Sequence, residues 1–256
     1  MAEIESLQNP KIQAARKLWK RRERDESGLF LIEGFRELSR ASLPIKTLFV
    51  CPPLFLGTNE EALIKKIGAE TYVVSEKVFR SLSYRDRPDG LLAVAKQQHF
   101  GLEILKAKNP LYIVAEAIEK PGNLGTILRS ADGCGADGVI VCDRCTDIFN
   151  PNVVRASVGT LFTQPVVEAT SDEALEWLQK QGIAIVAATP QADLVYTDAD
   201  LSGPIAIAVG TEQYGLSEKW MKQLQVKIPM KGVADSLNVA MATTLLLYEA
   251  VRQRSS

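Results

Sequence analysis

The sequence predicts an α/β protein of two domains, in which a small α/β sandwich precedes a larger domain built on a parallel sheet. Length is the first observation, because 256 residues exceed the usual size of a single domain. The second is that short apolar strands alternate with helical segments along the whole chain. The third is a polar, irregular stretch at residues 96–109, which we interpret as the linker. It separates predicted domains at residues 1–100 and 108–256.

The first domain is predicted to open with a basic helix over residues 9–24. Asn9 can cap this helix, Pro10 suits its first turn, and apolar residues at helical spacing give it one buried face. The rest of its surface is almost entirely lysine and arginine, although the whole chain has a net charge of -1. Such a patch suits a phosphate backbone, and a solvated helix face is the alternative interpretation. Together with two arginines of a later loop, the candidate RNA-binding residues are Lys17, Lys20, Arg21, Arg22, Arg85 and Arg87.

Short strands and helices alternate through the rest of this domain, as expected for a small sandwich. Its strands are predicted at residues 29–32, 47–51, 72–75 and 91–95. Its helices are predicted at residues 35–41, 60–67 and 76–82.

The second domain has longer units, in which strand and helix again alternate. Its strands are predicted at residues 111–115, 138–142, 163–168, 183–188, 205–209 and 225–229. Its helices are predicted at residues 123–134, 151–158, 172–181, 216–223 and 237–252. This alternation indicates a parallel sheet with helices on both faces. The last helix is apolar nearly all round, so we expect the core or a second subunit to bury it on more than one side.

Polar residues follow three of these strands at glycine-containing turns. After the first, a Pro-Gly turn leads to Asn123, which is predicted to open a helix that also carries Arg129. After the second, Glu212 lies on a loop between Gly210 and Gly215, two glycines that permit close backbone approach. Loops at strand ends often carry chemistry on a rigid scaffold, and ordinary strand–turn–helix corners are the alternative.

The third turn precedes the last helix. Ser236 is expected to cap this helix, and Asn238 would then lie in its first turn. A plain capping role is the simplest interpretation of Ser236 taken alone. The three turns together predict one site at the edge of the sheet.

Several other functions are disfavoured by the sequence. Residues 133–138 match G-x-G-x-x-G, but this pattern follows a predicted helix and precedes a strand, the reverse of a dinucleotide-binding site. We therefore interpret these glycines as a helix end and a turn. Cys142 and Cys145 form a lone C-x-x-C without further zinc ligands. His99 is the single histidine of the chain and lies in the linker, so neither a metal site nor histidine-based catalysis is expected.

The compartment is also suggested by the sequence. No N-terminal segment resembles a signal peptide, and no apolar run is long enough to span a bilayer. The four cysteines suggest no disulfide framework in a chain of this length. We expect a cytoplasmic protein.

Beyond these features, the chain resembles a known family. From about Leu111 onward, the segments PGNLGTILRSADGCGADG, GTEQYGLS and IPMKGVADSLNVAMATTLLLYE resemble the three motifs of the SpoU branch (TrmH-like) of the SPOUT RNA methyltransferases, which methylate ribose 2′-hydroxyls. The N-terminal half resembles, more loosely, the ribosomal-protein-like RNA-binding domain of several members. The carrying segments are NPKIQAARKL, LIEGFREL and SYRDRPDGLLAVA.

The resemblance implies a trefoil knot in the second domain, S-adenosylmethionine as cofactor, and a homodimer formed by the first and last helices of that domain. By motif position, the implied catalytic residues are Asn123, Arg129, Glu212, Ser236 and Asn238. The implied cofactor-binding residues are Thr189, Gly210, Gly215, Ile228, Met230 and Leu237.

The function expected from this resemblance is methylation of a ribose 2′-hydroxyl in RNA, with ribosomal RNA favoured over transfer RNA. Arg129 would hold the hydroxyl or a neighbouring phosphate and stabilise the developing alkoxide, because a guanidinium resists acting as a base. A non-catalytic RNA-binding or ribosome-assembly protein on the same fold is the main alternative. A nicotinamide-dependent oxidoreductase is a third possibility, and it would require a strand before Gly133.

Overall fold

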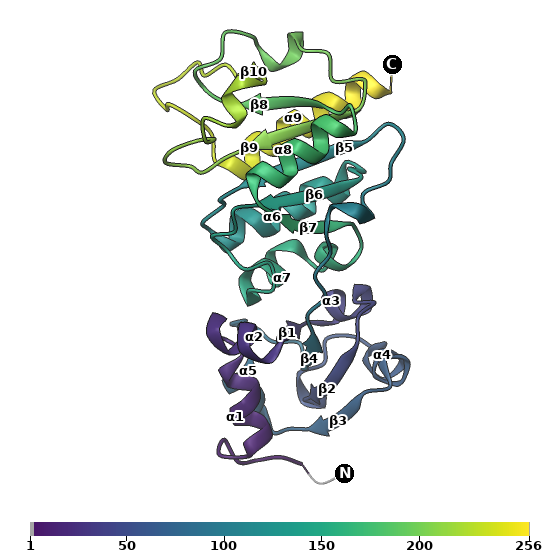
Figure 1. The fold of residues 1–256 in the computed structure, drawn as a ribbon. Coiled ribbons are helices and arrows are strands. Elements are labelled where there is room, and N and C mark those ends of the chain that lie inside the picture. The colour runs from purple at the N-terminus through teal and green to yellow at the C-terminus, as the bar shows by residue number, and fades with distance from the viewer. Residues whose placement is uncertain (1–2, 256) are drawn as a thin grey trace. The chain divides into compact units, whose positions relative to one another are not determined.

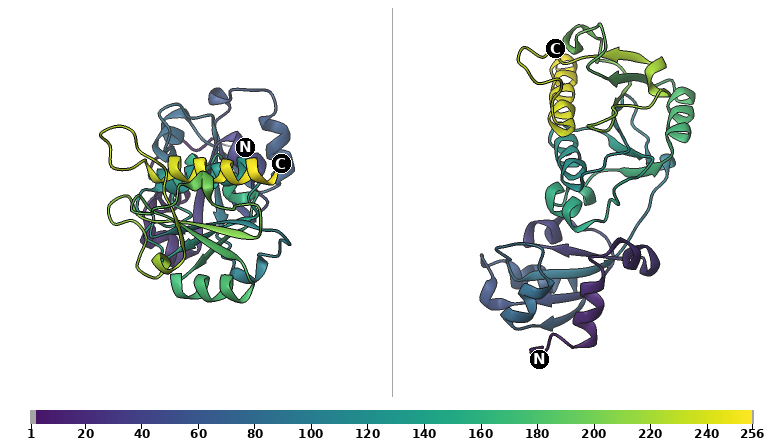
Figure 2. Two further views of the ribbon diagram at one scale, coloured as in Figure 1. Left: turned by 90° about the horizontal axis from the view of Figure 1, so that it is seen from above. Right: turned by 90° about the vertical axis from the view of Figure 1, so that its left-hand side faces the viewer.

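Two separate sheets organise residues 3–255, the part of the chain described in the computed structural model (Figures 1 and 2). The chain divides into two units. The N-terminal unit contains the residues up to Gln98 together with Asp147–Thr163, and the C-terminal unit contains His99–Thr146 and the residues from Gln164 on. Asp147–Thr163 thus packs with the first unit although it lies inside the second predicted domain. The domain limits of 1–100 and 108–256 stay a prediction.

The N-terminal unit is built on a four-stranded mixed sheet in the order β1-β4-β2-β3. Its strands are β1 (Leu29–Glu33), β2 (Ile45–Val50), β3 (Glu70–Val73) and β4 (Leu91–Lys96). Its helices are α1 (Pro10–Lys17), α2 (Arg21–Ser27), α3 (Phe35–Arg40), α4 (Glu60–Ile67), α5 (Glu76–Leu82) and α7 (Pro151–Ser157). β4 pairs antiparallel with β1 and β2, whereas β2 and β3 are parallel. Apolar residues of α1 and α5, among them Ile12 and Phe79, pack with one side of this sheet in a buried cluster.

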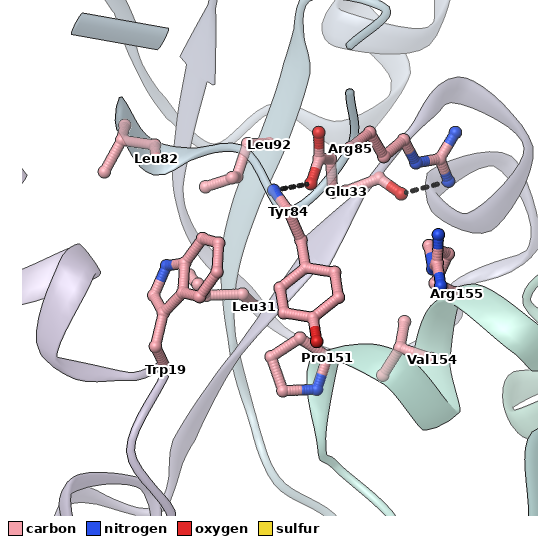
Figure 3. Close-up of a pocket in the computed structure, with 10 residues that line it drawn as sticks. All are labelled: Trp19, Leu31, Glu33, Leu82, Tyr84, Arg85, Leu92, Pro151, Val154 and Arg155. Atoms are coloured by element: carbon pink, nitrogen blue, oxygen red, sulfur yellow. Dashed lines mark hydrogen bonds between the residues drawn. The ribbon is translucent and has the colours of Figure 1, made fainter. Parts of the chain in front are cut away.

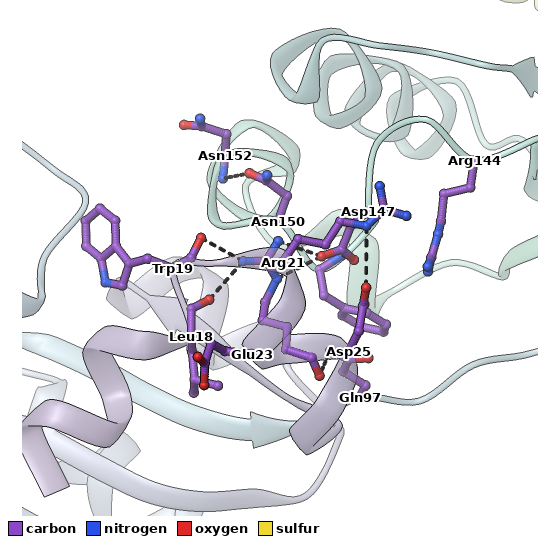
Figure 4. Close-up of polar contacts among 12 residues, drawn as sticks. Leu18, Trp19, Arg21, Glu23, Asp25, Gln97, Arg144, Asp147, Asn150 and Asn152 are labelled. Carbon is purple, nitrogen blue, oxygen red and sulfur yellow. Dashed lines mark hydrogen bonds and ion pairs between the residues drawn. The ribbon is translucent and has the colours of Figure 1, made fainter. Parts of the chain in front are cut away.

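The single basic helix predicted over residues 9–24 is wrong, because a turn separates α1 from α2. Arg24 explains the break. Its guanidinium is buried and donates to the backbone carbonyls of Leu18 and Trp19, both at 2.9 Å, at the end of α1. It also pairs with the buried carboxylate of Asp147 at 2.7 Å. Figure 4 labels these three partners, Leu18, Trp19 and Asp147. The Arg24 guanidinium therefore bonds to carbonyls that a continuous helix would have paired with its own backbone N–H groups.

The C-terminal unit carries a six-stranded sheet in the order β10-β8-β9-β5-β6-β7, in which every described pairing is parallel. Its strands are β5 (Leu111–Glu116), β6 (Gly138–Cys142), β7 (Val166–Ala169), β8 (Ala184–Ala188), β9 (Ile205–Val209) and β10 (Leu224–Val226). The predicted parallel sheet is confirmed. Every residue of β5 and β9 is buried, as expected for central strands that are covered on both faces.

Helices cover both faces of this sheet. They are α6 (Pro121–Gly133), α8 (Ser171–Lys180) and α9 (Val239–Arg254). α6 and α9 pack side by side on one face, and α8 lies on the other (Figure 2). The helix predicted over 216–223 is wrong, since only a short 3-10 turn forms there, at Trp220–Lys222.

The segment interpreted as a linker is partly packed. A 3-10 turn at Leu102–Ile104 and the buried side chain of Leu105 join the core of the C-terminal unit. The G-x-G-x-x-G stretch behaves as predicted: α6 ends at Gly133, and Gly135 has a left-handed φ of 72° before β6 begins. The trefoil knot stays a prediction. Among residues 3–255, no helix is both long and apolar enough to cross a membrane.

Candidate functional site

The three glycine turns meet because of the strand order. β5 and β9 are parallel neighbours, with Ala115 opposite Val209, so the loops that follow them leave the same edge of the sheet. Asn123 lies in the first turn of α6, which follows β5, and Glu212 lies in the loop after β9. α9 packs along α6, and this brings its first residues to the same place.

Three amide and ammonium groups converge on one carboxylate at this edge. Glu212 Oε1 accepts hydrogen bonds from Asn123 Nδ2 at 2.6 Å and from Asn238 Nδ2 at 2.7 Å. Asn238 Nδ2 also approaches Asn123 Oδ1 at 3.1 Å, and Lys120 Nζ donates to Glu212 Oε2. The hydrogen bond from Lys120 is the main cause that lowers the pKa of Glu212 below its ordinary value. Glu212 is therefore ionised at neutral pH and is held in place by three donors.

Asn238 also caps α9, a role that we predicted for Ser236. Its Oδ1 accepts from the backbone N–H of Ala240 at 3.0 Å, so Asn238 is the N-cap of α9 and the helix begins at Val239. The prediction that Ser236 caps the helix and that Asn238 lies in the first turn is wrong. Both residue types are good caps, and the choice falls on Asn238 because its amide nitrogen is also bound by Glu212.

A cavity of about 390 Å³ adjoins Glu212 in the C-terminal unit. Its walls come from the loops after β8, β9 and β10 and from the start of α9. All the residues predicted to bind the cofactor line it: Thr189, Gly210, Gly215, Ile228, Met230 and Leu237. Glu212 and Ser236 line it as well. Asn123, Arg129 and Asn238 are not among the lining residues.

The residues that line the cavity suit S-adenosylmethionine. A Cβ atom on Gly210 would stand 2.2 Å from the carbonyl oxygen of Gly215, so a glycine is needed for this loop to fold back on itself. Backbone hydrogen bonds between Thr211 and Gly215, at 3.0 and 3.1 Å, close the loop. Apolar residues line the cavity together with Glu212 and Asp235. Apolar walls suit an adenosine, and carboxylates suit a sulfonium or ammonium cation.

Arg129 stands apart from the cluster around Glu212. Its side chain is exposed on α6, and it has no hydrogen bond or ion pair with any residue that the structure describes. Its neighbour Ser130 bonds to Thr244 of α9 at 2.7 Å, so Arg129 lies beside the contact between α6 and α9. The predicted proximity of Arg129 to Asn123 and Glu212 is thus not a direct contact within one chain.

The role of Glu116 was not predicted from the sequence. Its carboxylate holds the turn that follows the loop after β9. This buried carboxylate ends β5 and accepts from Ser217 N–H, Ser217 Oγ and Trp220 Nε1 at 2.7 to 2.9 Å, and from Ser171 Oγ at 2.8 Å. These bonds hold residues 217–220 in a turn, which explains why the predicted helix 216–223 does not form. The sequence did carry a signal for this role, namely a single carboxylate at the end of an apolar strand, because a buried charge requires hydrogen-bond donors.

The predicted RNA-binding residues differ in exposure and in whether an acidic residue pairs with them. Lys17, Lys20 and Arg87 are exposed, and Arg22 is exposed but pairs with Glu26 at 2.7 Å. Arg21, also exposed, lies 3.5 Å from a carboxylate oxygen of Asp25.

Arg85 is turned inward. It donates to the backbone carbonyl of Glu33 at 2.9 Å (Figure 3). It also pairs with Glu37 at 2.6 Å. Its guanidinium therefore serves the interior of the N-terminal unit, unlike that of Arg87. Beside it, Trp19 and Tyr84 stack with ring centroids 4.9 Å apart around a cavity of about 20 Å³, room for about one water.

No group of histidine, cysteine or acidic residues in the described part of the chain is arranged to hold a metal ion. The four cysteines are free thiols. The chemistry available at the sheet edge is therefore that of amides, carboxylates and the cations near them.

Comparison with known proteins identifies the family. Residues 110–248 match the SpoU rRNA Methylase family, and residues 9–93 match the MRM3-like substrate binding domain. The 23S rRNA (uridine(2479)-2′-O)-methyltransferase of Streptomyces viridochromogenes is 32% identical over 93% of this chain and 88% of its own length.

Two solved structures are similar over the full length. The structure of an RNA 2′-O ribose methyltransferase is 41% identical with a TM-score of 0.89 and covers 100% of both chains. An AdoMet-bound rRNA methyltransferase from Sinorhizobium meliloti is 32% identical, also with a TM-score of 0.89, and covers 98% of this chain and 97% of that one. The chain belongs to the SpoU rRNA methylase family.

Proposed function

We propose that this protein methylates a ribose 2′-hydroxyl in ribosomal RNA, with S-adenosylmethionine as the methyl donor. The observation that carries the proposal is the cluster of Asn123, Glu212 and Asn238 beside a cavity whose lining suits that cofactor. The names of the relatives, each an RNA or rRNA methyltransferase, support the same reaction. With ribosomal RNA as the proposed substrate, we also propose a cytoplasmic location.

The residues of the chain act chiefly by positioning. Bound S-adenosylmethionine supplies an electrophilic methyl group. Glu212, fixed by three donors, keeps the two asparagine amides oriented at the edge of the cavity. Ser236, in the cavity wall, offers a hydroxyl to the cofactor or the ribose. Arg129 has a free guanidinium that can bind the ribose oxygen or a neighbouring phosphate and stabilise negative charge as the proton leaves. Alignment of the two reactants supplies most of the rate enhancement.

We also propose that the protein works as a homodimer through α9. Met241, Leu245 and Tyr248 are exposed large apolar residues at spacings of four and three, so they form one stripe on this helix. α6 packs beside α9, and Tyr248 Oη donates to the carbonyl of Gly133 at 3.3 Å. A second copy that covered this stripe would bury it and would also bring another chain close to Arg129.

The reaction is tested by mapping 2′-O-methyl groups in total RNA from cells with and without the protein. Loss of one ribosomal site, restored by the intact gene and not by an Arg129→Ala variant, supports the proposal. Identical maps together with no methyl transfer by purified protein would refute it. Light scattering tests the dimer: Leu245→Glu should halve the molar mass, whereas Leu224→Glu, on an exposed residue of β10, should not.

A further inference from the structure

The loop that carries Glu212 also presents an aromatic ring at the proposed cofactor cavity. Tyr214 lies two residues after Glu212 and lines this cavity of about 390 Å³, and yet it is 77% exposed. A side chain that lines a cavity and is also largely exposed lies at its rim. Single exposed tyrosines are common on protein surfaces, so exposure alone gives Tyr214 no role.

The backbone beneath this ring is held at several points. Thr211 and Gly215 exchange backbone hydrogen bonds of 3.0 and 3.1 Å, and the N–H of Tyr214 donates to Thr211 Oγ1 at 2.9 Å. Glu212, inside the same loop, is bound by three side-chain donors. The loop is thus a rigid support that fixes the position of Tyr214 at the rim.

The ring itself is not engaged by the fold. Within residues 3–255, Tyr214 forms no aromatic pair and no cation–π contact, and its hydroxyl has no hydrogen-bond partner. The ring of Tyr84, by contrast, stacks on Trp19 at 4.9 Å and lies 5.6 Å from the guanidinium carbon of Arg155. An unengaged ring on a rigid loop is pre-organised for a planar partner, because only its side-chain torsions remain to be fixed on binding.

The proposed reaction brings a nucleotide to the same rim. Displacement at the donor methyl group requires the ribose oxygen to lie about 3–3.5 Å from the methyl carbon. With the donor in the cavity, the target ribose must stand at the opening. Glu212 and Ser236 mark this opening, because both are exposed and both line the cavity. The base attached to that ribose therefore comes close to the loop that carries Tyr214.

The adenine of the cofactor is the other planar group expected near this loop. The cavity offers it apolar residues without Tyr214, among them Ile228, Met230 and Leu237, which are all half-buried. Tyr214 is much more exposed than these three. A ring that lies mostly in solvent is better placed for a base that arrives from solvent than for one held inside the cavity.

We propose that Tyr214 stacks on the base of the target nucleotide and so increases the affinity for the RNA substrate. This inference rests on the proposed function, from which it takes RNA as the substrate. Stacking tolerates any base, because every base has a π face. The contact uses the ring and not the hydroxyl, so phenylalanine can replace tyrosine at this position.

Steady-state methyl transfer tests the contact, with ribosomal RNA from cells that lack the protein as substrate. Tyr214→Ala should raise KM for RNA roughly tenfold, the loss expected for one stacked base, and should leave kcat nearly unchanged. Tyr214→Phe should behave like the wild type. The matched control is Phe100→Ala, which removes a 46% exposed aromatic ring of the same unit that does not line the cavity. All three changes are at exposed positions, so the fold should be kept.

A second measurement follows stacking without catalysis. The fluorescence of 2-aminopurine falls when this base stacks on an aromatic ring. The probe is a short oligouridine with one central 2-aminopurine, mixed with full-length protein and S-adenosylhomocysteine. The wild type, Tyr214→Phe and Phe100→Ala should all quench the probe, and Tyr214→Ala should lose most of the quenching.

Each competing role of Tyr214 has its own signature. An unchanged KM for RNA in Tyr214→Ala would overturn the proposal. Weaker cofactor binding by that variant in calorimetry would assign the ring to adenine instead, and a changed molar mass in light scattering would assign it to a second copy of the chain. Methyl transfer by the wild type with equal quenching by all variants removes only this inference. Quenching that depends on the ring, without any methyl transfer, removes only the proposed reaction.

Discussion

An exposed carboxylate of the C-terminal unit and three buried ones of the N-terminal unit are paired in opposite ways. In the C-terminal unit, Glu212 receives three side-chain donors and both of its oxygens are used. In the N-terminal unit, Glu37, Glu60 and Asp89 each keep one buried oxygen without a partner. The first cluster is complete before any ligand arrives, and the second is incomplete.

This difference has separate consequences for catalysis and for stability. A satisfied network is rigid, which suits a site that must align two reactants. Unsatisfied buried acceptors cost stability. We therefore expect variants of the first cluster to change turnover and variants of the second to change the free energy of unfolding.

The largest effect should follow loss of the free guanidinium of Arg129. Arg129→Ala should lower single-turnover methyl transfer by roughly 10²- to 10³-fold, as expected for a lost charge-stabilising donor. Calorimetry should show unchanged cofactor affinity, since Arg129 does not line the cavity. Arg129→Lys should recover little, because an ammonium cannot reproduce the planar fork. Normal turnover in Arg129→Ala would remove this residue from the mechanism.

The network itself is tested by Glu212→Gln. The amide cannot hold Lys120 by charge, and its NH₂ group cannot accept from the asparagines, so turnover should fall roughly tenfold. The control is Glu218→Gln, an exposed glutamate six residues further along the chain. If both variants behaved alike, the convergence of donors on Glu212 would have no catalytic meaning.

Glu116 tests whether a carboxylate with all its hydrogen-bond donors in place also stabilises the fold. Glu116→Gln places an NH₂ group among donors, and we expect a loss of roughly 1–3 kcal/mol in unfolding free energy. Cofactor affinity should fall as well, because the turn that follows the Gly210–Gly215 loop loses its anchor. Denaturant unfolding and calorimetry measure the two. Glu119→Gln, on an exposed residue of the next loop, should change neither.

The basic surface should act on RNA without regard to its sequence. Replacing Lys17 and Lys20 by glutamine should lower the slope of log affinity against log salt by about 1 to 2, without altering base preference. The same double change at Lys180 and Lys222, exposed residues of the other unit, is the control. A salt slope equal to that of the wild type would exclude the N-terminal lysines from the RNA interface.

The smallest effect is a difference in pH dependence between the clusters. The Lys120 hydrogen bond lowers the pKa of Glu212 below 4.5, so its stabilising contribution is complete above that pH and is lost as the pH falls through the lowered value. Burial raises the pKa of Glu37 above 4.5, so its contribution is present below pH 4.5 and is lost as the pH rises through the raised value. Melting temperatures of Glu212→Gln and Glu37→Gln, relative to wild type, should therefore change in opposite directions with pH. Parallel profiles would contradict this.

Local pattern was enough to predict most of the fold. Alternating apolar strands and helices predicted the parallel C-terminal sheet, and the resemblance to the SpoU branch implied which loops line the cavity. The predicted cofactor residues, from Thr189 to Leu237, all face one space. Periodicity and turn chemistry are written in neighbouring residues, and this is why a sequence reveals them.

Where distant residues compete for the same groups, only the tertiary structure decided the outcome. Arg24 divides the first helix by binding carbonyls at its break together with Asp147, which lies 123 residues away. Glu116 turns a predicted helix into a tight bend through Ser217 and Trp220, about a hundred residues further on. Glu212 selects Asn238 over Ser236 as the cap of α9. Each outcome depends on a charged side chain whose hydrogen-bond partners lie far away in the sequence, so these partners can be identified only in the folded chain.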